Sequence, residues 1–112
     1  MKKSDFVYLQ DMMRALKVIE TYLNGVSFNE FVKNQMRQDA TIRQLEILGE
    51  AANKLSVNFK QNNPDFPLRQ VISMRNFLIH GYDDLDLEIV WKTLQENIPQ
   101  LKSSLDKAKS DN

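Results

Sequence analysis

The 112-residue sequence predicts an all-α protein, an up-and-down bundle of four to five helices that forms a single domain over residues 1–112. Three observations support this class. Apolar residues recur at helical spacings of three and four through most of the chain. Glycine and proline number only three each, which favours long helices with few joints. No internal repeat, low-complexity tract or linker divides the chain.

The first helix is expected from about Ser4 to Asn24, where apolar residues form one stripe along a single face. Gly25 follows, and glycine is the common residue just beyond a helix C-terminus. Ser27 and Glu30 then stand three positions apart, which is the spacing of a capping box. A short second helix should therefore follow Ser27.

The third helix is expected from Asp39 to about Lys60 and has the most regular pattern. Its apolar positions recur at spacings of 3, 4, 3 and 4: Leu45, Leu48, Ala52, Leu55 and Phe59. Gly49 and Ala51 are small and would let another helix approach closely. Residues 61–67 form a loop, and Pro67 suits the first turn of a fourth helix that extends to about His80.

The last helix is expected after Asp83 and Asp84, either of which can cap it. Its apolar residues alternate spacings of 4 and 3, as in a helix-pairing seam: Leu87, Trp91, Leu94, Ile98, Leu101, Leu105 and Ala108. Pro99 interrupts this seam, so we expect a kink or a break between Asn97 and Pro99.

The composition excludes several kinds of site. There is no cysteine, which rules out disulfides and thiolate metal ligands and is compatible with a reducing cytoplasm. A single histidine rules out a multi-histidine metal site within one chain. No apolar run reaches membrane-spanning length, and the N-terminus lacks the apolar block of a signal peptide. We therefore expect a cytoplasmic protein with no membrane association.

The charge is balanced, with 15 basic and 15 acidic side chains. The chain is thus no broad polycation, and indiscriminate tight binding to nucleic acid is not expected. An RNA site would have to be a local cluster of arginine and lysine.

The segment that carries chemistry runs from Arg75 through Asn76 and His80 to Tyr82. Arg75 and His80 are five positions apart, so a regular helix offsets them by roughly 140°. They converge only if the helix ends or distorts near His80, which the following Gly81 favours. Asn76 lies four positions before His80, on the same helix face, and can orient the imidazole.

Each of these residues also has a purely structural interpretation. A histidine in the last turn of a helix favours the negative end of the helix dipole. Arg75 could pair with Glu88 or Asp86 on the surface, and Tyr82 could pack on the bundle. The residues of this segment alone leave both interpretations open.

The surrounding pattern resembles the HEPN ribonucleases, specifically the HepT-like branch. The segment has the R-x(4)-H-x-Y spacing of that family's signature in full, at Arg75, His80 and Tyr82. The stretch 43–52 is similar to the family's R-x-L-E-x-x-G-E-A helix. Asp86, Val90-Trp91 and the stretch 98–101 extend the resemblance, which covers about residues 36–105.

The resemblance implies a metal-independent endoribonuclease with no cofactor, acting on RNA as a homodimer with Arg75 and His80 as catalytic residues. It also implies a toxin of a type VII toxin–antitoxin pair, whose partner is an MNT-type nucleotidyltransferase antitoxin. In that family the partner adds AMP to the tyrosine two residues after the histidine and silences the toxin. Tyr82 is the matching position.

Metal-free RNA cleavage suits these residue types. It needs a base for the substrate's 2′-OH, an acid for the leaving 5′-oxygen and charge stabilisation at phosphorus. Histidine titrates near neutral pH, and arginine holds a phosphate bidentately. Because one chain has a single histidine, base and acid cannot both be histidines of one monomer, whereas a symmetric dimer would supply two copies of His80.

Three acidic or apolar features have competing interpretations. Glu46 and Glu50 could be paired catalytic carboxylates, but a solvated face with Arg43–Glu46 and Glu50–Lys54 pairs is the simpler reading. The resemblance also makes Glu46 and Arg43 candidates for lining the cleft. The acidic residues 83, 84 and 86 could suggest a cation site, which helix capping explains adequately. The Trp91 seam could be a partner surface, although core or dimer packing is commoner.

Two further functions compete with the ribonuclease. One is a non-catalytic HEPN binding module that presents substrate or nucleotide to a separate nucleotidyltransferase. The other is a plain structural bundle, which would leave Asn76, His80 and Tyr82 unexplained as a group.

Overall fold

The computed structural model describes residues 2–80 and 86–110, with side chains described for residues 2–77 and 86–108. Within these ranges the chain forms six helices and no strand. In chain order they are α1 (Lys3–Leu23), α2 (Phe28–Val32), α3 (Gln35–Asn53), α4 (Val57–Asn62), α5 (Leu68–His80) and α6 (Leu87–Ser110). The predicted all-α class is confirmed.

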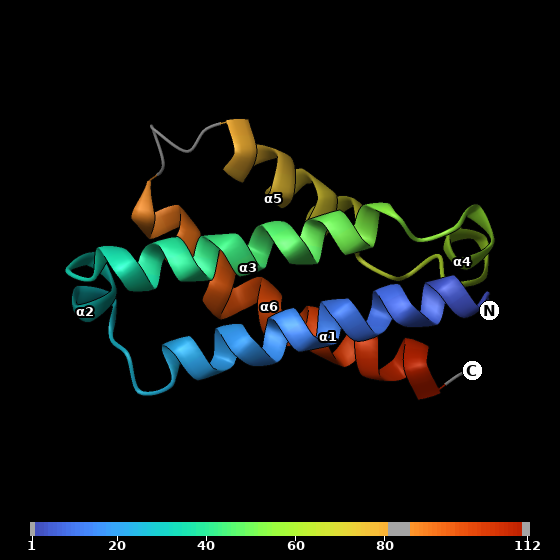
Figure 1. Cartoon of the computed structure of the whole chain (residues 1–112), viewed down its shortest axis with the longest axis horizontal. Coiled ribbons are helices and arrows are strands. Elements are labelled where there is room, and N and C mark those ends of the chain that lie inside the picture. The colour runs from blue at the N-terminus through green and yellow to red at the C-terminus, as the bar shows by residue number, and fades with distance from the viewer. Residues whose placement is uncertain (1, 81–85, 111–112) are drawn as a thin grey trace.

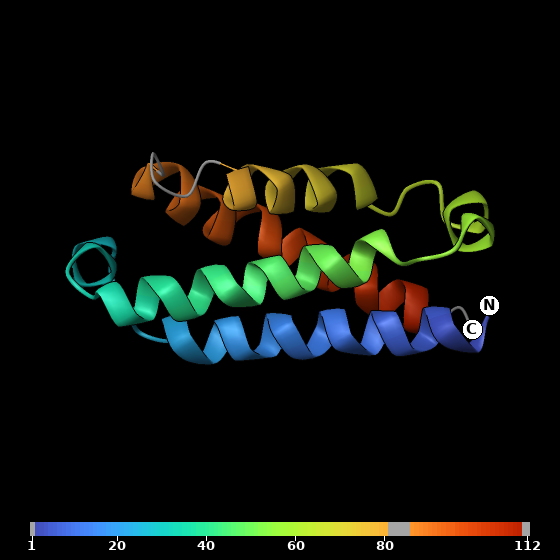
Figure 2. The same ribbon diagram turned by 45° about the horizontal axis from the view of Figure 1, so that its top comes forward.

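The four long helices alternate in direction, as the up-and-down bundle requires. α1 and α3 lie side by side and antiparallel, α5 packs on α3, and α6 crosses behind them (Figure 1). The short helices α2 and α4 close opposite ends of α3. Figure 2 shows the same bundle turned, with α5 and the first part of α6 on the side of α3 away from α1.

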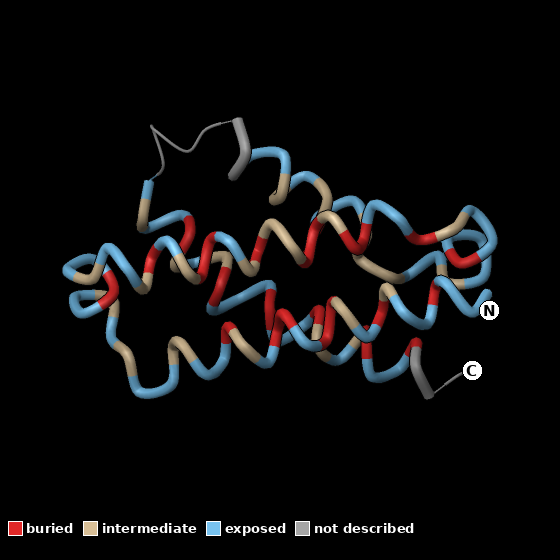
Figure 3. Tube along the Cα trace, in the orientation of Figure 1, coloured by how far each residue is buried: buried red, intermediate tan, exposed pale blue. Residues whose placement is uncertain are grey.

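The core is formed mainly by α1, α3 and α6. Their buried faces meet along the length of the bundle, whereas α5 contributes little to this core (Figure 3). Among the described side chains of α5, only Val71 is buried. α5 therefore lies on the surface of a core that the other long helices complete.

The first two helices begin and end as predicted. Gly25 has a positive φ of 73°, a conformation that favours glycine, directly after α1. Ser27 caps α2 by accepting a hydrogen bond from the Glu30 backbone N–H, while the Glu30 carboxylate accepts one from the Ser27 N–H. The capping box is thus complete.

The predicted third helix is wrong at both ends. It begins at Gln35 rather than Asp39, because the Asn34 side chain accepts a hydrogen bond from Arg37 N–H and caps it. It ends at Asn53, and Ser56 caps the separate helix α4 by accepting from Phe59 N–H. Apolar periodicity continues across this break, which is why the pattern suggested one helix.

A buried carboxylate fixes the break between α3 and α4. Asp5, at the start of α1, is 1% exposed. It accepts hydrogen bonds from the Ser56 backbone N–H at 2.8 Å and the Ser56 hydroxyl at 2.6 Å. Because charged acceptors make the stronger hydrogen bonds, this contact holds α4 against α1.

The last helix differs from its prediction in two respects. Its cap is Asp86, whose carboxylate accepts from Glu88 N–H; the predicted caps Asp83 and Asp84 lie outside the described residues. α6 also runs unbroken through Pro99, so of the predicted kink or break, the break is wrong and the kink stays a prediction. An internal proline costs about 3 kcal/mol. The buried seam on both sides of it offsets that cost, because each buried leucine or isoleucine contributes about 1.5–3 kcal/mol.

No helix within residues 2–80 and 86–110 combines the length and the apolar character needed to cross a membrane.

Candidate functional site

The candidate site is built at a close approach of α5 to α3. Gly49 of α3 faces Arg75 of α5. A Cβ atom placed on Gly49 would lie 2.5 Å from the Arg75 Cγ and closer still to the Arg75 Cβ. Such distances are far inside van der Waals contact. The prediction that small residues of this helix admit a neighbour is therefore confirmed at Gly49, and the neighbour is the helix that carries the signature.

Arg75 is held by its sequence neighbour rather than by an acid. Its Nη1 donates to the Asn76 Oδ1 at 3.0 Å. Neither Glu88 nor Asp86 pairs with it, so the surface ion pair considered from the sequence is not formed among the described residues. Within the described part of the chain, no carboxylate therefore balances the charge of this guanidinium, since its amide partner is neutral.

The inner nitrogen of the same side chain is unusual. The Arg75 Nε is buried and has no hydrogen-bond partner within the described part of the chain. Packing of the Arg75 stem against Gly49 accounts for this burial. Arg75 is thus fixed at its stem and has no carboxylate partner among the described residues, which leaves its charged end free to contact an anionic group.

The remaining signature residues are only partly described. The described part of α5 extends to His80, as predicted; whether the helix terminates there depends on residues 81–85, which lie outside the described ranges. The side chain of His80 and all of Tyr82 lie outside the described residues, so their predicted roles stay predictions. The expected relation of Asn76 to His80 also stays a prediction. Asn76 has instead the contact to Arg75 described above.

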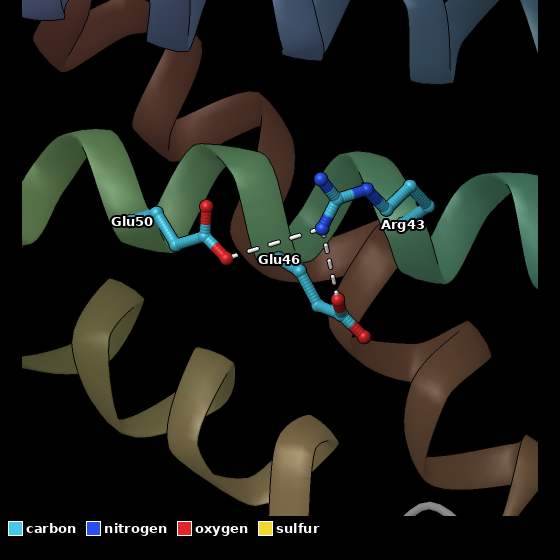
Figure 4. A network of polar contacts seen from close by, with 3 residues as sticks. All are labelled: Arg43, Glu46 and Glu50. Carbon is cyan, nitrogen blue, oxygen red and sulfur yellow. Dashed lines mark hydrogen bonds and ion pairs between the residues drawn. The ribbon is translucent and has the colours of Figure 1, made fainter.

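A polar network lies along α3 beside the site. The Arg43 Nη1 is 3.3 Å from the Glu46 carboxylate and 3.9 Å from that of Glu50 (Figure 4). The expected Arg43–Glu46 pair is confirmed. The expected Glu50–Lys54 pair is not formed; Lys54 instead lies 5.9 Å from the centre of the Tyr8 ring.

This network explains both glutamates as ion-pair partners. No group of three or more metal-binding side chains of histidine, cysteine, aspartate or glutamate occurs within the described ranges. Glu46 is the less exposed of the two, with a side chain 23% accessible against 41% for Glu50. Glu46 is therefore the carboxylate that is better placed to line the space between α3 and α5.

Trp91 packs within the chain rather than forming a free partner surface. Its ring centre lies 5.9 Å from that of Phe28 and 5.3 Å from that of Phe31. Both distances are typical of aromatic contacts inside proteins. Trp91 thus anchors α2 on α6 and is not a free partner surface.

One surface feature beside the site was not anticipated from the sequence. A groove of about 450 Å³ lies between α4, the following loop and the first half of α5. Its polar residues Lys60 and Arg69 come from two segments that no local pattern connects. The only sequence signal was the spacing of Arg69, Ser73 and Asn76, which places them on one helix face.

Comparisons with known proteins find a family and named relatives that match most of the chain. The model of the family described as ribonuclease HepT-like matches residues 12–108. A protein of Thermococcus cleftensis named "Probable ribonuclease HepT" is 39% identical over 107 residues, covering 96% of this chain and 97% of its own. One of Methanocaldococcus jannaschii named as a "Putative RNase" is 32% identical, covering 95% and 98%. No solved structure matches the chain.

The matched region contains α3, α5 and nearly all of α6, and hence both Gly49 and the Arg75 segment. The chain therefore belongs to the ribonuclease HepT-like family of endoribonucleases.

Proposed function

We propose that this protein is a metal-independent endoribonuclease toxin in which Arg75 and His80 are the catalytic residues. The observation that carries the proposal is the state of Arg75. Its stem is fixed against Gly49, and among the described residues its charge faces a neutral amide rather than a carboxylate. An RNA phosphate supplies the missing negative charge, and a bidentate contact stabilises the charge that develops as the phosphorus is attacked.

His80 supplies the proton transfers. In the proposed reaction one imidazole removes the proton of the substrate's 2′-OH, and the 2′-oxygen attacks the adjacent phosphorus. The bond to the 5′-oxygen breaks, and that oxygen takes a proton from an imidazolium. The products are a 2′,3′-cyclic phosphate and a 5′-OH. General acid–base catalysis of this type contributes about 10²–10⁴ in rate.

A second copy of the chain completes the site. Each chain contributes only one histidine, and a two-fold dimer brings two copies of the segment together. The exposed position of α5 supports this arrangement. Phe77, next to Asn76, is 46% exposed and offers apolar surface to a second chain. In the proposed dimer, Glu46 and Arg43 line the cleft beside Arg75.

The proposal includes control by a partner. A cognate MNT-type nucleotidyltransferase antitoxin adds AMP to Tyr82 in the cytoplasm and silences the ribonuclease. The added group carries bulk and a negative phosphodiester, which would fill the cleft and repel an RNA phosphate. Tyr82→Phe then stays toxic in cells that contain active antitoxin. An adenylate found by mass spectrometry on another residue would contradict the assignment of Tyr82.

The chemistry is tested on an end-labelled RNA and its products. Wild-type protein should leave 2′,3′-cyclic phosphate and 5′-OH ends, and a single 2′-deoxynucleotide at the cleaved position should block the reaction there. Ends with 3′-OH and 5′-phosphate would exclude attack by the 2′-OH. Binding of RNA or nucleotide without cleavage would instead favour the non-catalytic binding module.

A further inference from the structure

The groove beside α5 has the composition of a single-strand binding surface. Besides the cations named above, its lining includes the amide of Asn63, the hydroxyl of Ser73 and the apolar side chains of Phe66 and Ile72. The volume of about 450 Å³ is within the range of ligand sites. It therefore offers positive charge, hydrogen-bonding groups and an apolar surface to one occupant.

The charged side chains that line the groove are all positive. Lys60 and Arg69 both line it, and neither pairs with a carboxylate in the described part of the chain. No acidic side chain is among its lining residues. Asp65, in the same loop, lines a different hollow together with Ser104. The protein has no net charge, so this local excess of cations selects for an anionic partner.

An aromatic ring is fixed in the same groove. Phe66 packs edge-on against Phe59, with ring centres 5.3 Å apart and an angle of 84° between the planes. Phe59 is 3% exposed, so it anchors this contact in the core. Phe66 itself is only half-buried. A rigid, partly exposed aromatic ring beside two cations is the combination on which single-stranded nucleic acids stack their bases.

The groove and the candidate site share one helix, α5. Arg69, Ser73 and Asn76 follow one another at spacings of four and three along α5, which places them on one face. Ser73 lines the groove, and Asn76 accepts the hydrogen bond from Arg75. At 1.5 Å per residue, Arg69 and Arg75 are about 9 Å apart along the helix axis. A strand that passes Arg75 thus reaches the groove within a few nucleotides.

We propose that this groove binds the single-stranded RNA that flanks the cleaved phosphate, with Lys60 and Arg69 on backbone phosphates and Phe66 stacked on a base. The inference rests on the proposed function for its substrate class. It adds a binding subsite on α4, the following loop and the first half of α5, outside the signature segment. It also implies a preference for unpaired RNA, because only an unstacked base can lie on Phe66.

The test measures RNA binding separately from cleavage. In a His80→Ala background, the Kd of an unstructured RNA of about 12 nucleotides is measured across a salt series. Each phosphate contact to a single strand contributes about 0.7 to the slope of log Kd against log salt. Lys60→Gln/Arg69→Gln should therefore lower the slope by about 1.4. The matched control is Lys17→Gln/Lys33→Gln, which removes two exposed cations of α1 and of the end of α2 and should leave the slope unchanged.

The aromatic contact is tested in the same background. Phe66→Leu should weaken binding about tenfold, and Phe66→Trp should retain it, because stacking needs a flat ring rather than apolar volume. Urea unfolding of each variant shows whether the contact with Phe59 is retained. Equal affinities of the leucine and tryptophan variants, with both folded, would overturn the stacking role.

The outcomes separate this inference from the proposed function. If the wild type cleaves RNA but Lys60→Gln/Arg69→Gln binds RNA like the control, the groove assignment is overturned and the proposed function stands. If no RNA is cleaved but this double variant loses affinity and slope, the proposed function falls and the groove assignment stands. A double variant that binds RNA normally but loses binding of the nucleotidyltransferase would overturn the assignment in favour of a protein partner.

Discussion

Gly49→Ala should lower both stability and activity, although alanine is the better helix former. At an ordinary position inside a helix, this change stabilises by about 1 kcal/mol. Here the new Cβ would stand 2.5 Å from the Arg75 Cγ, about 1 Å short of a comfortable carbon–carbon contact. Overpacking of this kind costs about 1–3 kcal/mol. The net result is a loss of about 1 kcal/mol in the free energy of unfolding.

The same displacement should slow RNA cleavage. α5 must move away from α3 by about 1 Å, and a misplacement of that size costs about 100-fold in rate. Single-turnover cleavage and urea unfolding measure the two effects on one preparation. The expected result is a lower urea midpoint together with a large fall in the cleavage rate.

Gly25→Ala is the matched control for this variant. Gly25 has a φ of 73°, and no atom lies within 4 Å of a Cβ placed on it. Alanine in this conformation costs about 1–2 kcal/mol through its own backbone, without displacing a neighbouring helix. Gly25→Ala should therefore lose similar stability and keep its cleavage rate. The reasoning would be refuted if Gly49→Ala were more stable than wild type, or if both variants cleaved equally well.

Three further substitutions test the interactions that hold the fold. Asp5→Ala should lower the free energy of unfolding by about 2 kcal/mol, because Ser56 loses a charged acceptor. The control Asp11→Ala, at an exposed ion pair, should change the free energy of unfolding by less than about 0.5 kcal/mol. Urea midpoints that fall equally in both variants would refute the buried contact. Thr41→Val should raise the free energy of unfolding by about 1 kcal/mol, since the Thr41 hydroxyl is buried without a partner among the described residues. A clear loss in thermal or urea unfolding would show that the hydroxyl is satisfied. Arg43→Gln should leave the unfolding midpoint within about 0.5 kcal/mol of wild type but reduce RNA cleavage, whereas unchanged cleavage would remove Arg43 from the proposed cleft.

Local signals in the sequence correctly predicted the helix ends near Gly25 and Ser27. Gly25 and the Ser27–Glu30 box act within one turn, so their effect depends on neighbours that the sequence shows directly. Asn34 and Ser56 are signals of the same kind. Asn34 and Ser56 set where α3 begins and where α4 begins. The apolar spacing had suggested a single helix because it reflects which residues are buried, not whether the helix is continuous.

Long-range contacts could not be predicted from periodicity. Asp5 and Ser56 are 51 positions apart and meet only because α1 and α4 pack together. Arg75 had several possible acidic partners in the sequence, and its actual partner is Asn76, one position away. The small size of Gly49 did indicate a close helix contact. The contact of Gly49 with Arg75 in particular depends on the register between α3 and α5. The pattern within a single helix does not contain that register.

Prediction of the site itself depended on the family signature. The spacing of Arg75, His80 and Tyr82, taken alone, was compatible with a helix end that has no chemistry. The structure adds a stem fixed on Gly49 and an arginine without a carboxylate partner among the described residues. Both features favour anion binding over a surface ion pair.

The most direct test is the cleavage of one RNA in the presence of EDTA by wild type, Arg75→Ala and His80→Ala. Each variant must first show the circular dichroism spectrum and unfolding midpoint of a folded protein. Wild type should cleave without metal, and each variant should be slower by about 100-fold or more. Cleavage that stops in EDTA, or that continues at the wild-type rate in both variants, would contradict a metal-free active site built on Arg75 and His80.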